Sequence, residues 1–73
     1  MLSKRLGKRI SSLRKLKGFT QEQLAEATDY SVEFMSLVER GINSPTVAGL
    51  ERIATVLGTE VKDLFDFDGE GGK

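Results

Sequence analysis

The side chains of this chain that could do chemistry are hydroxyls, amides, carboxylates and cations, because its 73 residues include no cysteine and no histidine. Disulfides, the usual thiolate and imidazole metal sites, and nucleophile–histidine pairs are therefore excluded. A site built from carboxylates alone stays open, but no clustering of the acidic residues suggests one. The sequence therefore predicts a binding protein without metal or cofactor, and not an enzyme.

Arg14 and Glu39 are the charged residues for which the sequence predicts a specific partner. At about 100° per residue, Arg14 lies at the edge of the apolar stripe of residues 3–17, and Glu39 lies near Met35 on the apolar side of a later helix. An unpaired carboxylate there would be costly, and a guanidinium can hold both of its oxygens. We expect an Arg14–Glu39 salt bridge; the alternative is that Glu39 reaches water beside Arg40.

The net charge is zero, which argues against a nucleic-acid partner, but the charges are unevenly distributed. Seven of the eleven basic residues precede Glu22, and all eleven acidic residues lie at or after it. Such asymmetry hints that one end meets a polyanion. The alternative is that the basic residues decorate a solvated helix face, and the sequence leaves both open.

The elements that must position these groups are helices. Apolar residues at helical spacing predict the first helix over residues 3–17. The stretch 20–41 indicates two short helices joined by a tight turn: Thr20 and Gln23 form a capping box at the start of the first, and Ser31 can cap the second. Two helices of about eight to ten residues separated by so short a turn make a helix-turn-helix unit.

Two further helices complete a compact all-α, five-helix domain over residues 1–65. Thr46 is predicted to cap the fourth helix and Gly58 to end it, and Thr59 is predicted to cap a short fifth helix. The segment 66–73 is acidic and glycine-rich, which favours a disordered tail. The longest apolar runs are too short for a membrane span or a signal peptide, so we expect a soluble, cytoplasmic protein.

Sparse motifs then recur along the chain in a characteristic order and spacing. They are Thr20-Gln21, Leu24-Ala25, Ser31, Ser36, Glu39-Arg40-Gly41, Ser44-Pro45-Thr46, Leu50, Ile53-Ala54 and Leu57-Gly58. This set resembles the lambda-repressor-like (Cro-like, XRE) helix-turn-helix family of bacterial and phage DNA-binding proteins, over roughly residues 6–65. The resemblance implies a sequence-specific regulator of transcription, such as a repressor, that binds double-stranded DNA at the nucleoid. It also implies the Arg14–Glu39 pairing.

The resemblance assigns roles to two groups of residues. The candidates for phosphate contacts are Thr20, Gln21, Arg40, Asn43 and Ser44. The positions at which the family reads bases hold Val32, Glu33, Ser36 and Leu37. The family favours Gln, Ser, Lys or Arg at these places, whereas Val32 and Leu37 can touch only apolar features such as a thymine methyl group, and Glu33 can accept from cytosine N4. The loop after Gly41 also lacks the Lys or Arg that usually adds affinity.

The apolar residues near the C-terminus predict that two copies of the chain associate. They are Val61, Leu64, Phe65 and Phe67, and one short helix cannot easily bury them all. Such a patch on a small chain is typical of an interface, so we expect a two-fold homodimer that binds a palindromic operator. The alternative is that Leu64 and Phe65 close the core of the monomer.

A second class of function remains open, because a fold does not fix a function. Val32, Leu37 and Phe34 would then form an apolar patch for a partner protein, as in an antitoxin or an accessory regulator. Binding to random duplex DNA that weakens steeply with salt would distinguish DNA binding from this protein-interaction module.

Overall fold

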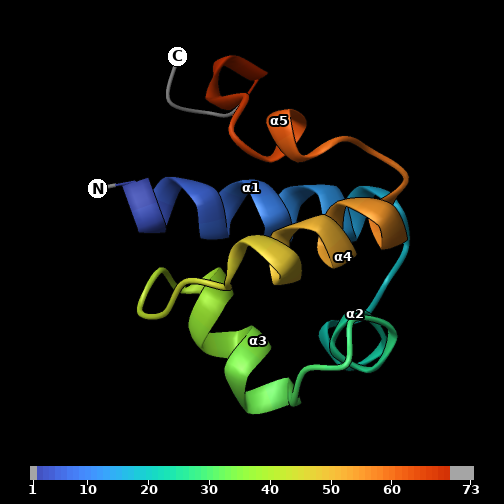
Figure 1. Ribbon diagram of the computed structural model, residues 1–73. Helices are drawn as coiled ribbons and strands as arrows, with labels where there is room; N and C mark the ends of the chain where they lie inside the picture. The colour runs from blue at the N-terminus through green and yellow to red at the C-terminus, as the bar shows by residue number, and fades with distance from the viewer. Residues whose placement is uncertain (1, 70–73) are drawn as a thin grey trace.

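The computed structural model describes residues 2–69, and every regular element among them is a helix. The elements are α1 (Leu2–Leu16), α2 (Gln21–Ala27), α3 (Val32–Glu39), α4 (Val47–Leu57), α5 (Val61–Leu64) and a 3-10 turn (Phe67–Gly69) (Figure 1). This confirms the predicted all-α fold of five helices.

Local hydrogen bonds start the helices where the sequence predicts them. Thr20 Oγ1 accepts from the backbone N–H of Gln23 (3.0 Å), and Gln23 Oε1 accepts from the N–H of Thr20 (2.9 Å), which completes the capping box. Ser31 and Thr46 each accept from the backbone N–H three residues on, at 3.1 and 3.0 Å. Gly58 ends α4 in the left-handed conformation, with φ of 72°.

The helices are arranged around α1, which has α2 and α3 on one side and α5 on the other (Figure 1). All five contribute to one core of buried apolar side chains: Leu6, Ile10, Leu24, Ala25, Met35, Val38, Ile53, Ala54, Leu57 and Leu64. The core therefore fixes the position of α3 relative to the other four helices.

Gly7 lets α1 approach the end of α3. A Cβ at this position would overlap the carbonyl oxygen of Val38 and lie 2.7 Å from that of Glu39. An isolated glycine in a helix interior costs stability, so its presence there indicates close packing. The backbone that carries Glu39 therefore lies directly against α1.

Leu64 corrects one sequence prediction. It was expected at a dimer interface, but its side chain is 0% exposed and belongs to the core of the monomer. The alternative, that the C-terminal helix closes the monomer core, is thus right for this residue. Leu64 is the apolar residue of α5 that turns toward α1 and α4, so it is not available to a second copy.

The start of α5 and the segment after it also differ from expectation. Glu60, not Thr59, precedes α5 as its N-cap residue. Within the stretch 66–73 that was expected to be disordered, residues 67–69 instead form a 3-10 turn, because Phe67 packs against Arg5 of α1, 4.6 Å from the guanidinium carbon to the ring centroid. Residues 70–73 lie outside the described part of the chain. None of the helices between residues 2 and 69 is long and apolar enough to cross a bilayer.

Candidate nucleic-acid interface

The turn between α2 and α3 sets the angle between these two helices. Asp29 has φ of 66°, the left-handed conformation, which Asp tolerates better than most residues that carry a side chain. Thr28 is fully buried, and its Oγ1 donates to the carbonyl oxygen of Leu24 (2.8 Å). Arg52 of α4 donates from Nε to the carbonyl oxygen of Thr28 (2.8 Å) and lies over the ring of Tyr30 (5.0 Å). The turn is therefore fixed by hydrogen bonds to the end of α2 and by the Arg52 side chain of α4.

The predicted Arg14–Glu39 ion pair is present, which confirms that prediction. Arg14 Nε donates to one carboxylate oxygen of Glu39 at 2.7 Å, and Nη2 donates to the other at 3.1 Å. The side chains are 11% and 6% exposed, so the pair is largely shielded from water. The alternative, that Glu39 reaches water beside Arg40, is therefore wrong.

Gln21 joins this pair from the start of α2. Its Nε2 donates to Glu39 Oε1 at 3.1 Å. An amide nitrogen carries two hydrogens, so this bond uses one of them and leaves the other. A carboxylate of α3 thus binds a guanidinium of α1 and an amide of α2 together.

The outer face of α3 borders a hollow of about 370 Å³, which we call the α3 hollow. Its lining residues are Gln21, Val32, Glu33, Ser36, Leu37 and Arg40. All four predicted base-reading residues lie here, next to two of the five predicted phosphate-binding residues. Glu33 and Arg40 are exposed, and the other four are half-buried. The structure therefore brings most of the predicted site together on one surface.

The remaining predicted phosphate-binding residues do not line the α3 hollow. Thr20 lies exposed just before α2, where its Oγ1 caps the helix. Asn43 and Ser44 are exposed in the loop between α3 and α4. Ser44 Oγ lies 3.2 Å from Ser3 Oγ of α1, so this loop is tied to the beginning of the chain.

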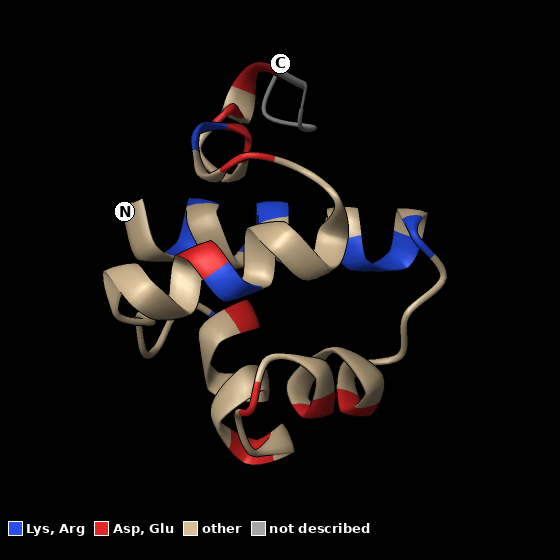
Figure 2. Cartoon of the chain, turned by 45° about the vertical axis from the view of Figure 1, so that its right-hand side comes forward, with Lys and Arg blue, Asp and Glu red and all other residues tan. Residues whose placement is uncertain are grey.

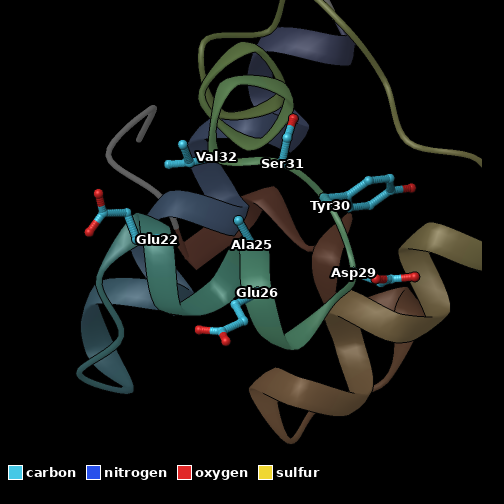
Figure 3. Close-up of a pocket in the computed structure, with 7 residues that line it drawn as sticks. All are labelled: Glu22, Ala25, Glu26, Asp29, Tyr30, Ser31 and Val32. Carbon is cyan, nitrogen blue, oxygen red and sulfur yellow. The ribbon is translucent and has the colours of Figure 1, made fainter.

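A second hollow, of about 470 Å³, adjoins the first between α2 and the start of α3 (Figure 3). Three of its lining residues are the acidic Glu22, Glu26 and Asp29, and it shares Val32 with the α3 hollow. Three carboxylates repel an anion, so this groove is unsuited to a phosphate. Sequence reasoning did not single out these acids, although the i, i+4 spacing of Glu22 and Glu26 places these two on one face of α2.

Acidic and basic residues occupy different parts of the molecule. Figure 2 shows the acids of α2 and of the start of α3 on the side away from α1, and the bases along α1. The three arginines of α1 bind within the protein: Arg5 lies on the ring of Phe67, Arg9 Nε donates to the carbonyl oxygen of Asp63 (2.9 Å), and Arg14 holds Glu39. The lysines of α1 are exposed. Three of the seven N-terminal bases therefore make contacts within the protein.

The apolar residues predicted at the dimer interface differ in exposure. Phe65 is 37% exposed and makes an edge contact with Phe67, with 6.2 Å between the ring centroids. Val61 and Phe67 are half-buried, and Leu64 belongs to the core. The surface open to a partner is thus smaller than the sequence predicts.

Comparison with known proteins finds relatives that share one kind of domain. Residues 5–66 match the family described as "Helix-turn-helix domain". The chain is 41% identical over 58 residues to the uncharacterized HTH-type transcriptional regulator YazB of Bacillus subtilis (strain 168), covering 80% of this chain and 84% of YazB. The HTH-type transcriptional regulator SinR of the same organism is 34% identical over 62 residues, which cover 84% of this chain and 56% of SinR.

Solved structures share the arrangement of helices. The clp gene regulator ClgR of Corynebacterium glutamicum superposes with a TM-score of 0.88 at 33% identity, over 92% of this chain and 86% of that one. A crystal structure of SinR, the master regulator for biofilm formation, in complex with DNA gives a TM-score of 0.78 at 34% identity, over 84% of this chain and 98% of that one.

Proposed function

The chain belongs to the helix-turn-helix domain family of the lambda-repressor-like (XRE) type, and from this premise we propose that it regulates transcription by binding double-stranded DNA in a sequence-specific manner. The observation that carries the proposal is the α3 hollow, in which Gln21, Arg40 and the outward residues of α3 lie on one surface. The relative SinR, which has been crystallised with DNA, supports it.

In the proposed complex, α3 enters the major groove and its flanks hold the backbone. Gln21 and Arg40 contact phosphates from the α3 hollow, and Thr20, Asn43 and Ser44 do so from the segments before α2 and after α3. Such contacts fix the position of a protein on DNA but carry no sequence information. Affinity then depends on few cations, since Arg40 is the one basic residue among those that line the hollow.

The base-reading chemistry follows from the four side chains of α3. Val32 and Leu37 offer apolar contact to a thymine methyl group, and Glu33 can accept from cytosine N4. Ser36 can donate or accept and so discriminates less. We therefore expect thymine and cytosine among the bases that α3 prefers in a half-site.

We further propose a homodimer in the cytoplasm, associated with the nucleoid, that binds a palindromic operator. The half-buried or exposed residues Val61, Phe65 and Phe67 would form the interface, without Leu64. A single recognition helix reads only a few base pairs, so two copies on two half-sites provide the affinity that one copy lacks. The proposal includes no catalysis and no cofactor.

Selection of bound duplexes from a random pool tests the proposal. We expect enrichment of a two-fold symmetric sequence with half-sites about one helical turn apart. Gln21→Ala should weaken binding to all sequences about equally, whereas Leu37→Ala should change the preferred base. Failure to enrich any sequence at low salt would contradict sequence-specific binding.

The second candidate function is a protein-interaction module. The second hollow, between α2 and the start of α3, supports it, because its lining combines the acids Glu22, Glu26 and Asp29 with the apolar Ala25 and Val32. A basic segment of a partner protein would suit this surface, whereas DNA would not. Retention of wild-type affinity for DNA in a Glu22→Gln and Glu26→Gln variant would assign the two surfaces to different roles.

A further inference from the structure

Side chains from three helices meet where α2 begins. Arg14 of α1 holds the carboxylate of Glu39 through Nε and Nη2, at 2.7 and 3.1 Å. Its Nη1 donates to the carbonyl oxygen of Phe19 (2.9 Å), which precedes the cap residue of α2. Glu39 Oε1 also accepts from Gln21 Nε2 (3.1 Å). The start of α2 is thus bound both through its backbone and through its first side chain.

These contacts restrict Gln21. A glutamine side chain on a helix surface samples many rotamers, and binding must order it at an entropic cost. Here one amide hydrogen is bound to a carboxylate that is 6% exposed and that a guanidinium holds in place. The other amide hydrogen remains for a ligand at the wall of the α3 hollow, which Gln21 lines.

We propose that Arg14 and Glu39 are positioning residues, which hold the amide of Gln21 so that its remaining hydrogen meets a DNA phosphate. This inference rests on the proposed DNA binding and deepens it. A shielded ion pair is often no more stabilising than apolar side chains of similar size, so fold stability alone does not account for the pair. The ion pair is accounted for by its effect on the position of the Gln21 amide.

A double-mutant cycle that keeps the net charge constant tests the inference. The first change is Arg14→Met together with Glu39→Met, which removes one positive and one negative charge. The second is Gln21→Ala, which is also neutral. The affinity for the selected duplex is measured in the parent, in both variants and in their combination, with the urea unfolding midpoint of each.

We expect Gln21→Ala to weaken binding about tenfold in the parent, the lower end of the effect of one hydrogen bond to a charged group. In the chain with both methionines, the same change should weaken it less than about twofold, since the amide is no longer held there. The slope of log K against log salt should stay the same throughout, because a neutral amide releases no counterion. An equal effect of Gln21→Ala in both backgrounds would overturn the inference.

A control variant and a substitute variant guard against effects of lost helix structure or lost folding. Gln23→Ala loosens the start of α2 without touching Glu39, so it should leave the coupling between Gln21 and the ion pair unchanged. If the methionine pair does not fold, Glu39→Gln replaces it and is compared with and without Gln21→Ala at equal charge.

The side-chain amide signals of Gln21 are followed by NMR without DNA. The two amide protons of any glutamine give separate signals, so the readout is their chemical shifts. Shifts in the parent that differ from those of a free glutamine and move toward them in the variant support the positioning role, and unchanged shifts contradict it. No salt-dependent DNA binding by the parent would instead refute the proposed function, and the inference with it.

Discussion

Glu33 is the acidic residue among those that line the α3 hollow, and it is exposed there. In the proposed complex its carboxylate lies near phosphates and reads at most one base. Glu33→Gln should therefore raise the affinity for random duplex DNA at low salt, by up to about fivefold for a repulsion of about 1 kcal/mol, and relax the preference at one position. Fluorescence anisotropy with random and selected duplexes measures both effects.

Glu51→Gln on α4 is the matched control, because it removes one exposed acid outside the α3 hollow. If both variants raise the affinity equally, Glu33 acts only through the net charge and has no position at the interface.

Asp63 links stability to pH. The hydroxyl of Thr59 donates to its carboxylate (2.6 Å), and so does the backbone N–H of Glu60 (3.0 Å). These two hydrogen bonds, the Thr59 one foremost, lower the pKa of Asp63 below its ordinary 3.8. A pKa that is lower in the folded state gives stability that is present above pH 3.8 and is lost as the pH falls through the folded value.

Asp63→Asn should therefore destabilise the protein at pH 7, and the difference from the parent should shrink as the pH falls toward 2. Urea unfolding at a series of pH values measures this. Asp66→Asn, at an exposed carboxylate nearby, serves as the control. A difference that stays constant from neutral to acid pH would show that the carboxylate of Asp63 is not stabilised by folding.

At the scale of the helices, Gly7 decides how closely α1 and α3 approach. Gly7→Ala adds a methyl group that overlaps the carbonyl oxygens of Val38 and Glu39. Helix propensity alone favours alanine by about 0.5–1 kcal/mol, but overpacking costs about 1–3 kcal/mol, so we expect a net loss of stability. Lys8→Ala, at an exposed neighbour, should change the unfolding free energy by less than about 0.5 kcal/mol. Equal or greater stability of Gly7→Ala would contradict the close crossing.

The helices could be predicted from the sequence because the signals that begin and end them are local. Thr20, Ser31 and Thr46 cap the elements they were predicted to cap, since a cap needs only an oxygen and an N–H three residues away. Arg14 and Glu39 were also predictable, because each lies at the edge of its apolar face and a buried charge needs a partner.

Contacts between distant segments were not predictable in this way. Leu64 lies in the core and Phe65 at the surface, although the two apolar residues are neighbours at the end of α5. Only the packing of α5 on α1 separates them. The support of the turn by Arg52 depends likewise on where α4 lies, and the hydrogen bond from Gln21 to Glu39 depends on the crossing of α2 and α3.

At the scale of the whole molecule, the proposed DNA surface and the proposed dimer surface do not overlap. Figure 1 shows α5 on the opposite side of α1 from α2 and α3, so both surfaces can be occupied at once. The molecule measures 32 × 24 × 21 Å. Two copies side by side therefore place equivalent helices a few tens of ångströms apart, the range of the roughly 34 Å that separate successive major grooves on one face of B-DNA.

Phe65→Glu tests the dimer directly. Phe65 is 37% exposed, so a charge there should block association without emptying the core. We expect the parent to sediment as a dimer at equilibrium and the variant as a monomer, with binding to a palindromic duplex reduced more than binding to a single half-site. Leu16→Glu is the control: Leu16 is 79% exposed at the far end of α1, and its replacement should leave the dimer intact. A parent that stays monomeric at high concentration, with the same sedimentation profile as Phe65→Glu, would mean that Phe65 serves only to cover the core beneath it.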